Sequence, residues 1–293
     1  MSRAPFLIVL VSFPLFLSGC GPDSQLKRAG KLEKKGKYYE AWQKYQEFAA
    51  KHPKHPGAPE ALFHAGWLAQ KQLKDCSMAA VFYDSVLEKH PQSAPWARLA
   101  TNQKNNCPDY FPLLAGAEWV EGDSGTKGKN ARIETTCRPA PEKGTLPSEA
   151  GVMSRTYFAG ASKFKTIELV YKKTDTELQE FSDDTPLRPK VIMMMPLTVG
   201  TRWKTRSADR LFSYEISAMD VTVKVEAGEF PSCVQVKSLP EGSTTPTYDY
   251  YAPGVGRVLN SFLTPQGEKR NIELLSFKPG SEVDFKTVDI SAP

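Results

Sequence analysis

The sequence predicts an α+β protein of two domains, with N-terminal helical hairpins followed by an antiparallel β-sheet or half-barrel. Apolar residues recur at helical spacing as far as about residue 107 and alternate singly beyond it, as expected where helices give way to half-buried strands. The 293 residues suffice for two modest hydrophobic cores. The predicted divisions are a signal peptide over 1–19, a lipid anchor and tether over 20–24, a helical domain over 25–107 and a β-rich domain over 108–293.

The first twenty residues have the pattern of a secretion signal. Arg3 precedes an apolar run over 6–17, which is shorter than the roughly 20 residues that a membrane-spanning helix needs. The run ends in Leu17-Ser18-Gly19-Cys20, which resembles the lipobox of bacterial lipoproteins. The resemblance implies that Cys20 becomes the acylated first residue of the mature chain and holds it on a membrane. The alternative is an ordinary signal peptide followed by a buried cysteine.

The residue after Cys20 indicates which membrane of the envelope would hold the protein. In Gram-negative lipoproteins an Asp at this place commonly retains the protein in the inner membrane, and Gly21 stands there instead. The resemblance therefore implies the periplasmic face of the outer membrane. The rest of the chain has no long apolar stretch, which excludes a polytopic membrane protein.

The helical segment contains an internal repeat. The block Ala41-x-x-x-Tyr45 with His52-Pro53 recurs 38 residues later as Ala79-x-x-x-Tyr83 with His90-Pro91. Small residues at fixed places let paired helices approach closely, and the proline ends each second helix. The pattern resembles the tetratricopeptide repeat and, more narrowly, the lipoproteins of outer-membrane β-barrel assembly. We expect five helices, at 25–35, 38–51, 58–72, 76–90 and 94–105.

The repeat resemblance carries a functional expectation. Tetratricopeptide modules present a concave groove that binds a peptide segment or a helix of another protein. The resemblance implies a non-enzymatic protein-binding or scaffolding module, with an envelope protein or peptide segment held in the helical groove. The alternative is a lipid or lipoprotein carrier whose concave sheet holds acyl chains, which requires an apolar cavity of several hundred Å³. An envelope hydrolase without histidine is a third, weaker hypothesis.

Positive charge is concentrated in the helical segment. Residues 21–107 carry 14 Lys and Arg against 8 Asp and Glu, and the residues from 108 onward carry 23 against 25. Six basic residues follow the anchor closely: Lys27, Arg28, Lys31, Lys34, Lys35 and Lys37. They form either a solvated helix face or a surface for anionic lipid head groups, where each is worth about 1 kcal/mol. We do not expect nucleic acid to bind an exported, membrane-bound protein.

Beyond residue 107 the apolar residues alternate with polar ones. The inward sets are Ile167, Leu169 and Tyr171; Val221, Val223 and Val225; and Val234 and Val236. This pattern is typical of antiparallel strands with one buried face. We expect about ten strands in a single twisted sheet or open half-barrel.

Four cysteines remain after Cys20, and no two have the C-x-x-C spacing of a redox or zinc site. An oxidising periplasm favours disulfides. Cys76 begins the fourth predicted helix and Cys107 follows the fifth, which runs back antiparallel, so these two should meet. Cys137 and Cys233 would then tie strands of the β-rich domain, with buried free thiols as the alternative.

The chain carries no motif that predicts catalysis. All four histidines lie in the first third, which excludes a Ser-His-Asp triad within the β-rich domain. His52-x-x-His55 has no evident third ligand nearby for a metal ion. We therefore expect a protein that is not an enzyme and that holds no cofactor or metal.

Overall fold

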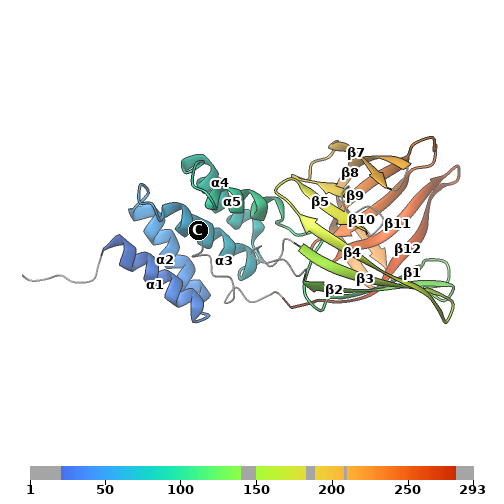
Figure 1. Ribbon diagram of the computed structural model, residues 1–293, viewed down its shortest axis with the longest axis horizontal. Coiled ribbons are helices and arrows are strands. Elements are labelled where there is room, and N and C mark those ends of the chain that lie inside the picture. The colour runs from blue at the N-terminus through green and yellow to red at the C-terminus, as the bar shows by residue number, and fades with distance from the viewer. Residues whose placement is uncertain (1–20, 140–149, 183–188, 208–209, 282–293) are drawn as a thin grey trace, which may run out of the picture.

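The computed structural model describes residues 21–139, 150–182, 189–207 and 210–281. The signal peptide and Cys20, which carries the predicted lipid anchor, lie outside these residues. The described chain is an α+β protein, with helices at one end and a curved antiparallel sheet at the other (Figure 1). Within it, every helix is too short or too polar to cross a bilayer.

The described residues of the first domain form five helices. They are α1 (Pro22–Lys34), α2 (Tyr38–Lys51), α3 (Ala58–Lys71), α4 (Cys76–Lys89) and α5 (Trp96–Asn105). The predicted bounds agree within three residues, since proline follows the last residue of both α2 and α4 closely and cannot continue a helix. The predicted tether over 20–24 is wrong in part. Residues 22–24 form the first turn of α1, because proline is well suited to a helix start.

The repeated positions lie in the core of the helical domain. Ala41 and Ala79 are fully buried, and Tyr45 and Tyr83 are at most 2% exposed. The small alanines allow close helix packing, while the tyrosines, Phe48 and other aromatic residues fill the space between the helices. The helical periodicity of the sequence therefore identifies this core correctly.

The described residues of the second domain form one antiparallel sheet of 12 strands, two more than expected. The order is β6-β5-β4-β3-β2-β1-β12-β11-β10-β9-β8-β7. The strands are β1 (Glu118–Asp123), β2 (Ala131–Pro139), β3 (Ala150–Ala159), β4 (Ser162–Lys173), β5 (Glu177–Phe181), β6 (Lys190–Met194), β7 (Arg202–Ser207), β8 (Arg210–Val225), β9 (Gly228–Pro240), β10 (Thr247–Ala252), β11 (Gly256–Thr264) and β12 (Gly267–Lys278). The predicted inward residues of β4, β8 and β9 all contribute to its core.

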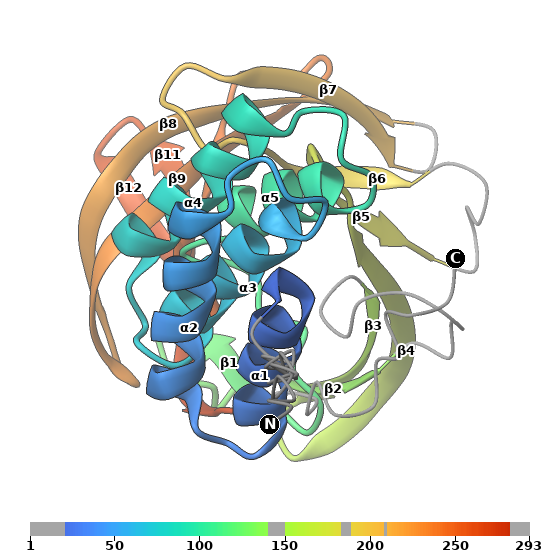
Figure 2. The same cartoon turned by 90° about the vertical axis from the view of Figure 1, so that its left-hand side faces the viewer.

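The sheet is nearly closed on itself. Consecutive strands pair except β6 with β7, and the first strand pairs with the last, so the meander curls around a single interior (Figure 2). At the seam the Val191 backbone N–H donates to Thr205 Oγ1 at 3.1 Å, and Trp203 Nε1 donates to the Val191 carbonyl at 3.0 Å. Side chains thus satisfy backbone groups of an edge strand that would otherwise stay unpaired.

A disulfide joins Cys76 and Cys107, with 5.3 Å between their Cα atoms. Cys76 is the first residue of α4 and Cys107 lies two residues beyond α5, as the antiparallel path of the two helices predicts. The bond fixes the start of the connection to the sheet against the helical domain.

The predicted bond between Cys137 and Cys233 is wrong, because both residues are free, buried thiols. Cys137 lies in β2 and Cys233 in β9, with β1, β12, β11 and β10 between them in the sheet. This separation exceeds the roughly 7 Å between Cα atoms that a disulfide can bridge. Burial raises the pKa of each thiol to about 11, so both stay protonated near neutral pH.

Cys76→Ser should destabilise the helical domain by about 3 to 4 kcal/mol, because the disulfide closes a loop of 31 residues in the unfolded chain. Denaturant unfolding followed by far-ultraviolet circular dichroism measures this loss, and reductant should reproduce it in the unmodified chain. Cys137→Ser is the control. Because Cys137 is a free thiol, reductant should destabilise this variant as much as it destabilises the unmodified chain. Equal stability of the Cys76 variant and the unmodified chain would contradict the assignment.

Candidate functional site

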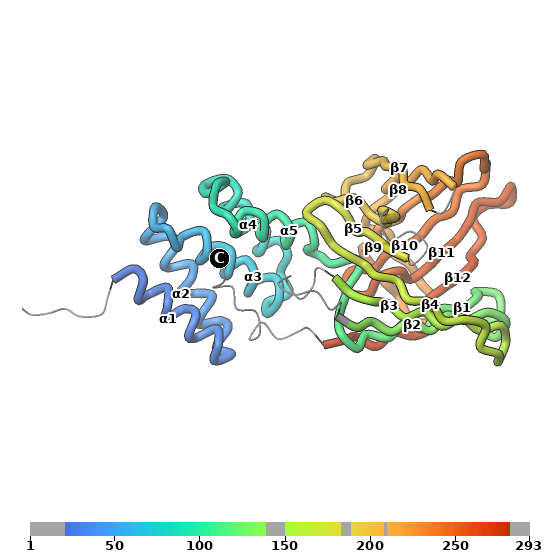
Figure 3. The backbone as a smooth tube through the Cα atoms, viewed as in Figure 1, coloured from blue at the N-terminus to red at the C-terminus, as the bar shows by residue number. Residues whose placement is uncertain are grey.

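The connection between α5 and β1 enters the end of the curved sheet that faces the helices (Figure 3). Tyr110, Phe111 and Leu113 are all buried there. The Phe111 ring lies 4.8 Å from that of Tyr171, and the Tyr110 hydroxyl donates to the Ser232 carbonyl at 3.0 Å. This segment, residues 108–114, is called the plug below because it fills one end of the sheet.

A buried ion pair holds the plug in place. Lys173 Nζ donates to both carboxylate oxygens of Asp109 at 2.7 Å. The Lys173 side chain is only 4% exposed and that of Asp109 24%. The Asp109 carbonyl also accepts the Gly254 N–H at 2.7 Å. The plug is therefore tied to β4 by charge and to the turn before β11 by its backbone.

Further charged groups meet inside the sheet beyond the plug. Arg257 donates through Nε to Glu121 Oε1 at 2.9 Å and lies 3.3 Å from Asp249 Oδ1. Arg155 lies 5.7 Å from the centre of the Tyr171 ring, and the Tyr171 hydroxyl donates to Glu180. These residues come from β1, β3, β4, β5, β10 and β11. They form a polar layer across the interior that connects strands distant in the sequence.

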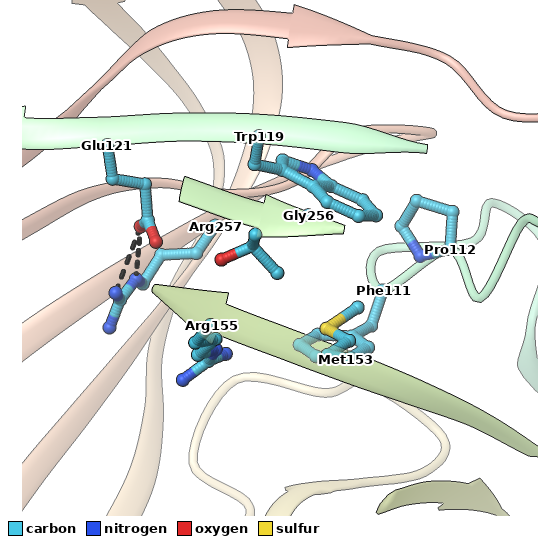
Figure 4. Close-up of a pocket in the computed structure, with 9 residues that line it drawn as sticks. Phe111, Pro112, Trp119, Glu121, Met153, Arg155, Gly256 and Arg257 are labelled. Carbon is cyan, nitrogen blue, oxygen red and sulfur yellow. Dashed lines mark hydrogen bonds and ion pairs between the residues drawn. The ribbon is translucent and has the colours of Figure 1, made fainter. Parts of the chain in front are cut away.

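The space between plug and polar layer is small. A cavity of about 30 Å³ is lined by Phe111, Pro112, Trp119, Glu121, Thr135, Met153, Arg155, Gly256 and Arg257 (Figure 4). This volume accommodates one or two water molecules. An acyl chain needs several hundred Å³, which this cavity does not offer.

A second depression, of about 390 Å³, lies over β7, β8 and β9. Its wall includes Arg202, Lys204, Glu215 and Lys237. On β7 these basic residues alternate with the buried Trp203, so they point to the outer face of the sheet. The same wall also includes Trp203, Tyr214 and Leu239. The depression therefore mixes charged and apolar side chains on the outside of the sheet and differs from the interior cavity that a carrier requires.

The predicted basic cluster is a surface feature of α1 and the turn after it. All six side chains, from Lys27 to Lys37, are exposed. Lys35 caps the C-terminal end of the helix, and Lys37 forms an ion pair with Glu40 at 2.9 Å. Cys20, the predicted acylation site, lies outside the described residues, two positions before the first residue of α1.

Glu33, the acidic residue in the last turn of α1, points away from this cluster. Glu33 accepts a hydrogen bond from the Tyr45 hydroxyl at 2.7 Å, and His64 Nδ1 lies 3.0 Å from its carboxylate. Burial alone would raise the pKa of Glu33. Hydrogen bonds from His64 and Tyr45 outweigh this effect, so the pKa of Glu33 is below the ordinary 4.5. Glu33 therefore stays ionised within the helical domain.

Sequence reasoning missed the charges inside the sheet, although a signal for them existed. The inward alternation of β4 continues from Tyr171 to Lys173, and that of β1 from Trp119 to Glu121. The same period of two places both charges in the interior. Their partners lie 64 and 136 residues away in the chain, and only the tertiary structure brings them together.

Comparisons with known proteins give two similar solved structures. A candidate exported protein with a YmcC-like fold from Bacteroides fragilis is 16% identical, with 57% of this chain and 98% of that chain covered and a TM-score of 0.39. A candidate lipoprotein from Parabacteroides distasonis is 15% identical, with 58% and 98% covered and a TM-score of 0.39. No protein-family model and no curated protein matches the chain.

Asp109→Ala should destabilise the protein by about 3 kcal/mol, because it leaves the buried Lys173 ammonium without its partner. Denaturant unfolding followed by tryptophan fluorescence measures the change. The control is Glu118→Ala, which removes an exposed ion pair with Lys278 and should cost less than about 1 kcal/mol. Similar effects of the two substitutions would show that the plug is not held by this ion pair.

Glu33→Gln should destabilise the helical domain by about 1 to 2 kcal/mol at neutral pH, because Tyr45 and His64 lose a charged acceptor. The pKa of Glu33 is lowered in the folded state, so its contribution is present above the ordinary 4.5 and is lost as the pH falls through the folded pKa. The free energies of unfolding of the two chains, measured at several pH values, should therefore become equal in acid. Glu40→Gln, at an exposed position, should show no such convergence.

Proposed function

We propose that this chain is a lipoprotein of the bacterial envelope that binds another envelope protein through its helices and catalyses no reaction. The observation that carries the proposal is the position of α1, which begins two residues after the lipobox cysteine. Acylation of Cys20 would hold the helical domain directly at a membrane, with the curved sheet beyond it. The absence of Asp after Cys20 favours the periplasmic face of the outer membrane.

Exposed apolar side chains on α2 and α4 support a protein-binding role. Tyr39 is 59% exposed and its ring lies 5.7 Å from that of Trp42, which makes an edge contact with Phe82. Val81, beside Phe82, is 63% exposed. Aromatic residues are enriched where proteins contact one another, so this surface of α2 and α4 is the part of the helical domain that we assign to the partner. The repeat resemblance favours the same role.

The carrier alternative has less support. The interior cavity of about 30 Å³ lies between the plug and the polar layer and is too small for an acyl chain. A lipid carrier would need the plug to leave the sheet and the buried pair of Lys173 and Asp109 to separate, which costs several kcal/mol. The sheet better suits a rigid second domain that spaces or presents the helical domain.

A photo-crosslinking residue placed at Val81 should capture one envelope protein of defined mass in living cells, because this exposed side chain of α4 is next in sequence to Phe82, which contacts Trp42. The matched control places the same residue at Phe164 of β4, which is 73% exposed at the other end of the protein. Mass spectrometry of the purified mature chain should find acyl groups on Cys20, and none in Cys20→Ala. A chain without acyl groups, or equal capture from both sites, would contradict the proposal, and bound lipid without a protein partner would favour the carrier.

A further inference from the structure

The basic residues of α1 share one face of the helix. At 100° per residue, Lys27, Arg28, Lys31, Lys34 and Lys35 fall within an arc of about 120°. The opposite side carries Leu26, Ala29 and Leu32, which pack in the helical core. These five basic side chains, called the basic face below, are all exposed. The helix is thus apolar towards the domain and cationic towards the solvent.

The basic face is not neutralised by ion pairs within the described residues. Within the described residues, no carboxylate lies within ion-pair distance of its five side chains, whereas Lys44 and Lys51 of α2 both pair with Glu47 at 2.6 Å. The acidic residues of α1 offset this charge only in part, through Asp23, whose side chain is 81% exposed. Glu33 is turned inward to Tyr45 and His64, and Asp23 lies in the first turn, 3.4 Å from His55.

The proposed anchor brings this face to a bilayer. Gly21 alone separates Cys20 from the first residue of α1, and α1 lies at the end of the protein remote from the sheet (Figure 1). A surface held this close to lipid head groups lies within the Debye length of about 8 Å, where charges still act. Amphipathic basic helices next to an acyl chain are a common second signal for membrane binding.

We infer that α1 lies flat on the bilayer with its basic face on anionic phospholipid head groups. This inference rests on the proposed function for its setting and adds the lipid class and the orientation. With α1 parallel to the membrane, the curved sheet projects away from it, and the aromatic surface of α2 and α4 stays clear of the lipid. Each basic residue should strengthen binding about fivefold, independently of acylation.

The test uses the mature chain from residue 20 with Cys20→Ser, so that only the protein surface contributes. It should bind vesicles of phosphatidylethanolamine with about 30% phosphatidylglycerol, should bind pure phosphatidylcholine weakly, and should dissociate as salt is raised. The triple variant Lys27→Gln, Lys31→Gln, Lys34→Gln should bind the anionic vesicles about 100-fold more weakly. Vesicle sedimentation measures the partition coefficient, and circular dichroism checks the fold.

The matched control is Lys44→Gln, Lys51→Gln, Lys54→Gln, which removes the same net charge from exposed positions of α2 and the turn after it. It should weaken binding less than about threefold. Equal weakening by both triple variants, or no preference for anionic vesicles, would overturn the inference. The chain used in this test carries no acyl group, so a negative result would contradict only the binding of α1 to anionic lipid. Acylation of Cys20 is tested separately by mass spectrometry.

Discussion

The buried ion pair between Lys173 and Asp109 joins the two halves of this protein. Asp109 lies two residues after Cys107, which the disulfide holds against α4. A short segment therefore connects a covalent bond in the helical domain to a charge inside the sheet. Removing a lysine from water is unfavourable unless a carboxylate meets it, and the carboxylate arrives only when the plug occupies the end of the sheet. This ion pair acts together with the contact of Phe111 with Tyr171 and the hydrogen bond from Gly254 to the Asp109 carbonyl, and these contacts hold the plug in the end of the sheet.

The interior of the sheet is filled by side chains that contact one another. Its strands are long and curved, and the sheet closes through side chains of Thr205 and Trp203 at the seam. A curved sheet of this length could enclose a cavity, but aromatic residues of the plug and the pair of Glu121 with Arg257 occupy the space. Polar groups in a buried interior favour one arrangement of partners. The sheet therefore serves best as a rigid body.

The surface of the helical domain divides into two parts with different chemistry. The basic face of α1 lies next to the proposed acyl chain, while the aromatic surface of α2 and α4 carries Tyr39 and Val81. Glu33 is turned inward to Tyr45, so it does not weaken the positive charge on the outer side of α1. Under the two proposals above, one helical domain would contact a membrane and a protein through different surfaces.

Local sequence patterns determined much of this protein. Helix bounds followed from periodicity and from Pro53 and Pro91, the inward residues of β4, β8 and β9 followed from alternation, and Cys76 with Cys107 followed from two antiparallel helices. These features depend on residues close in the chain. The number of strands, the separation of Cys137 from Cys233 and the partner of Arg257 depend on which distant strands pair, and the partner of Lys173 depends on where the plug enters the sheet. Only the tertiary structure decided them, because pairing along a closed sheet joins residues that no local period relates.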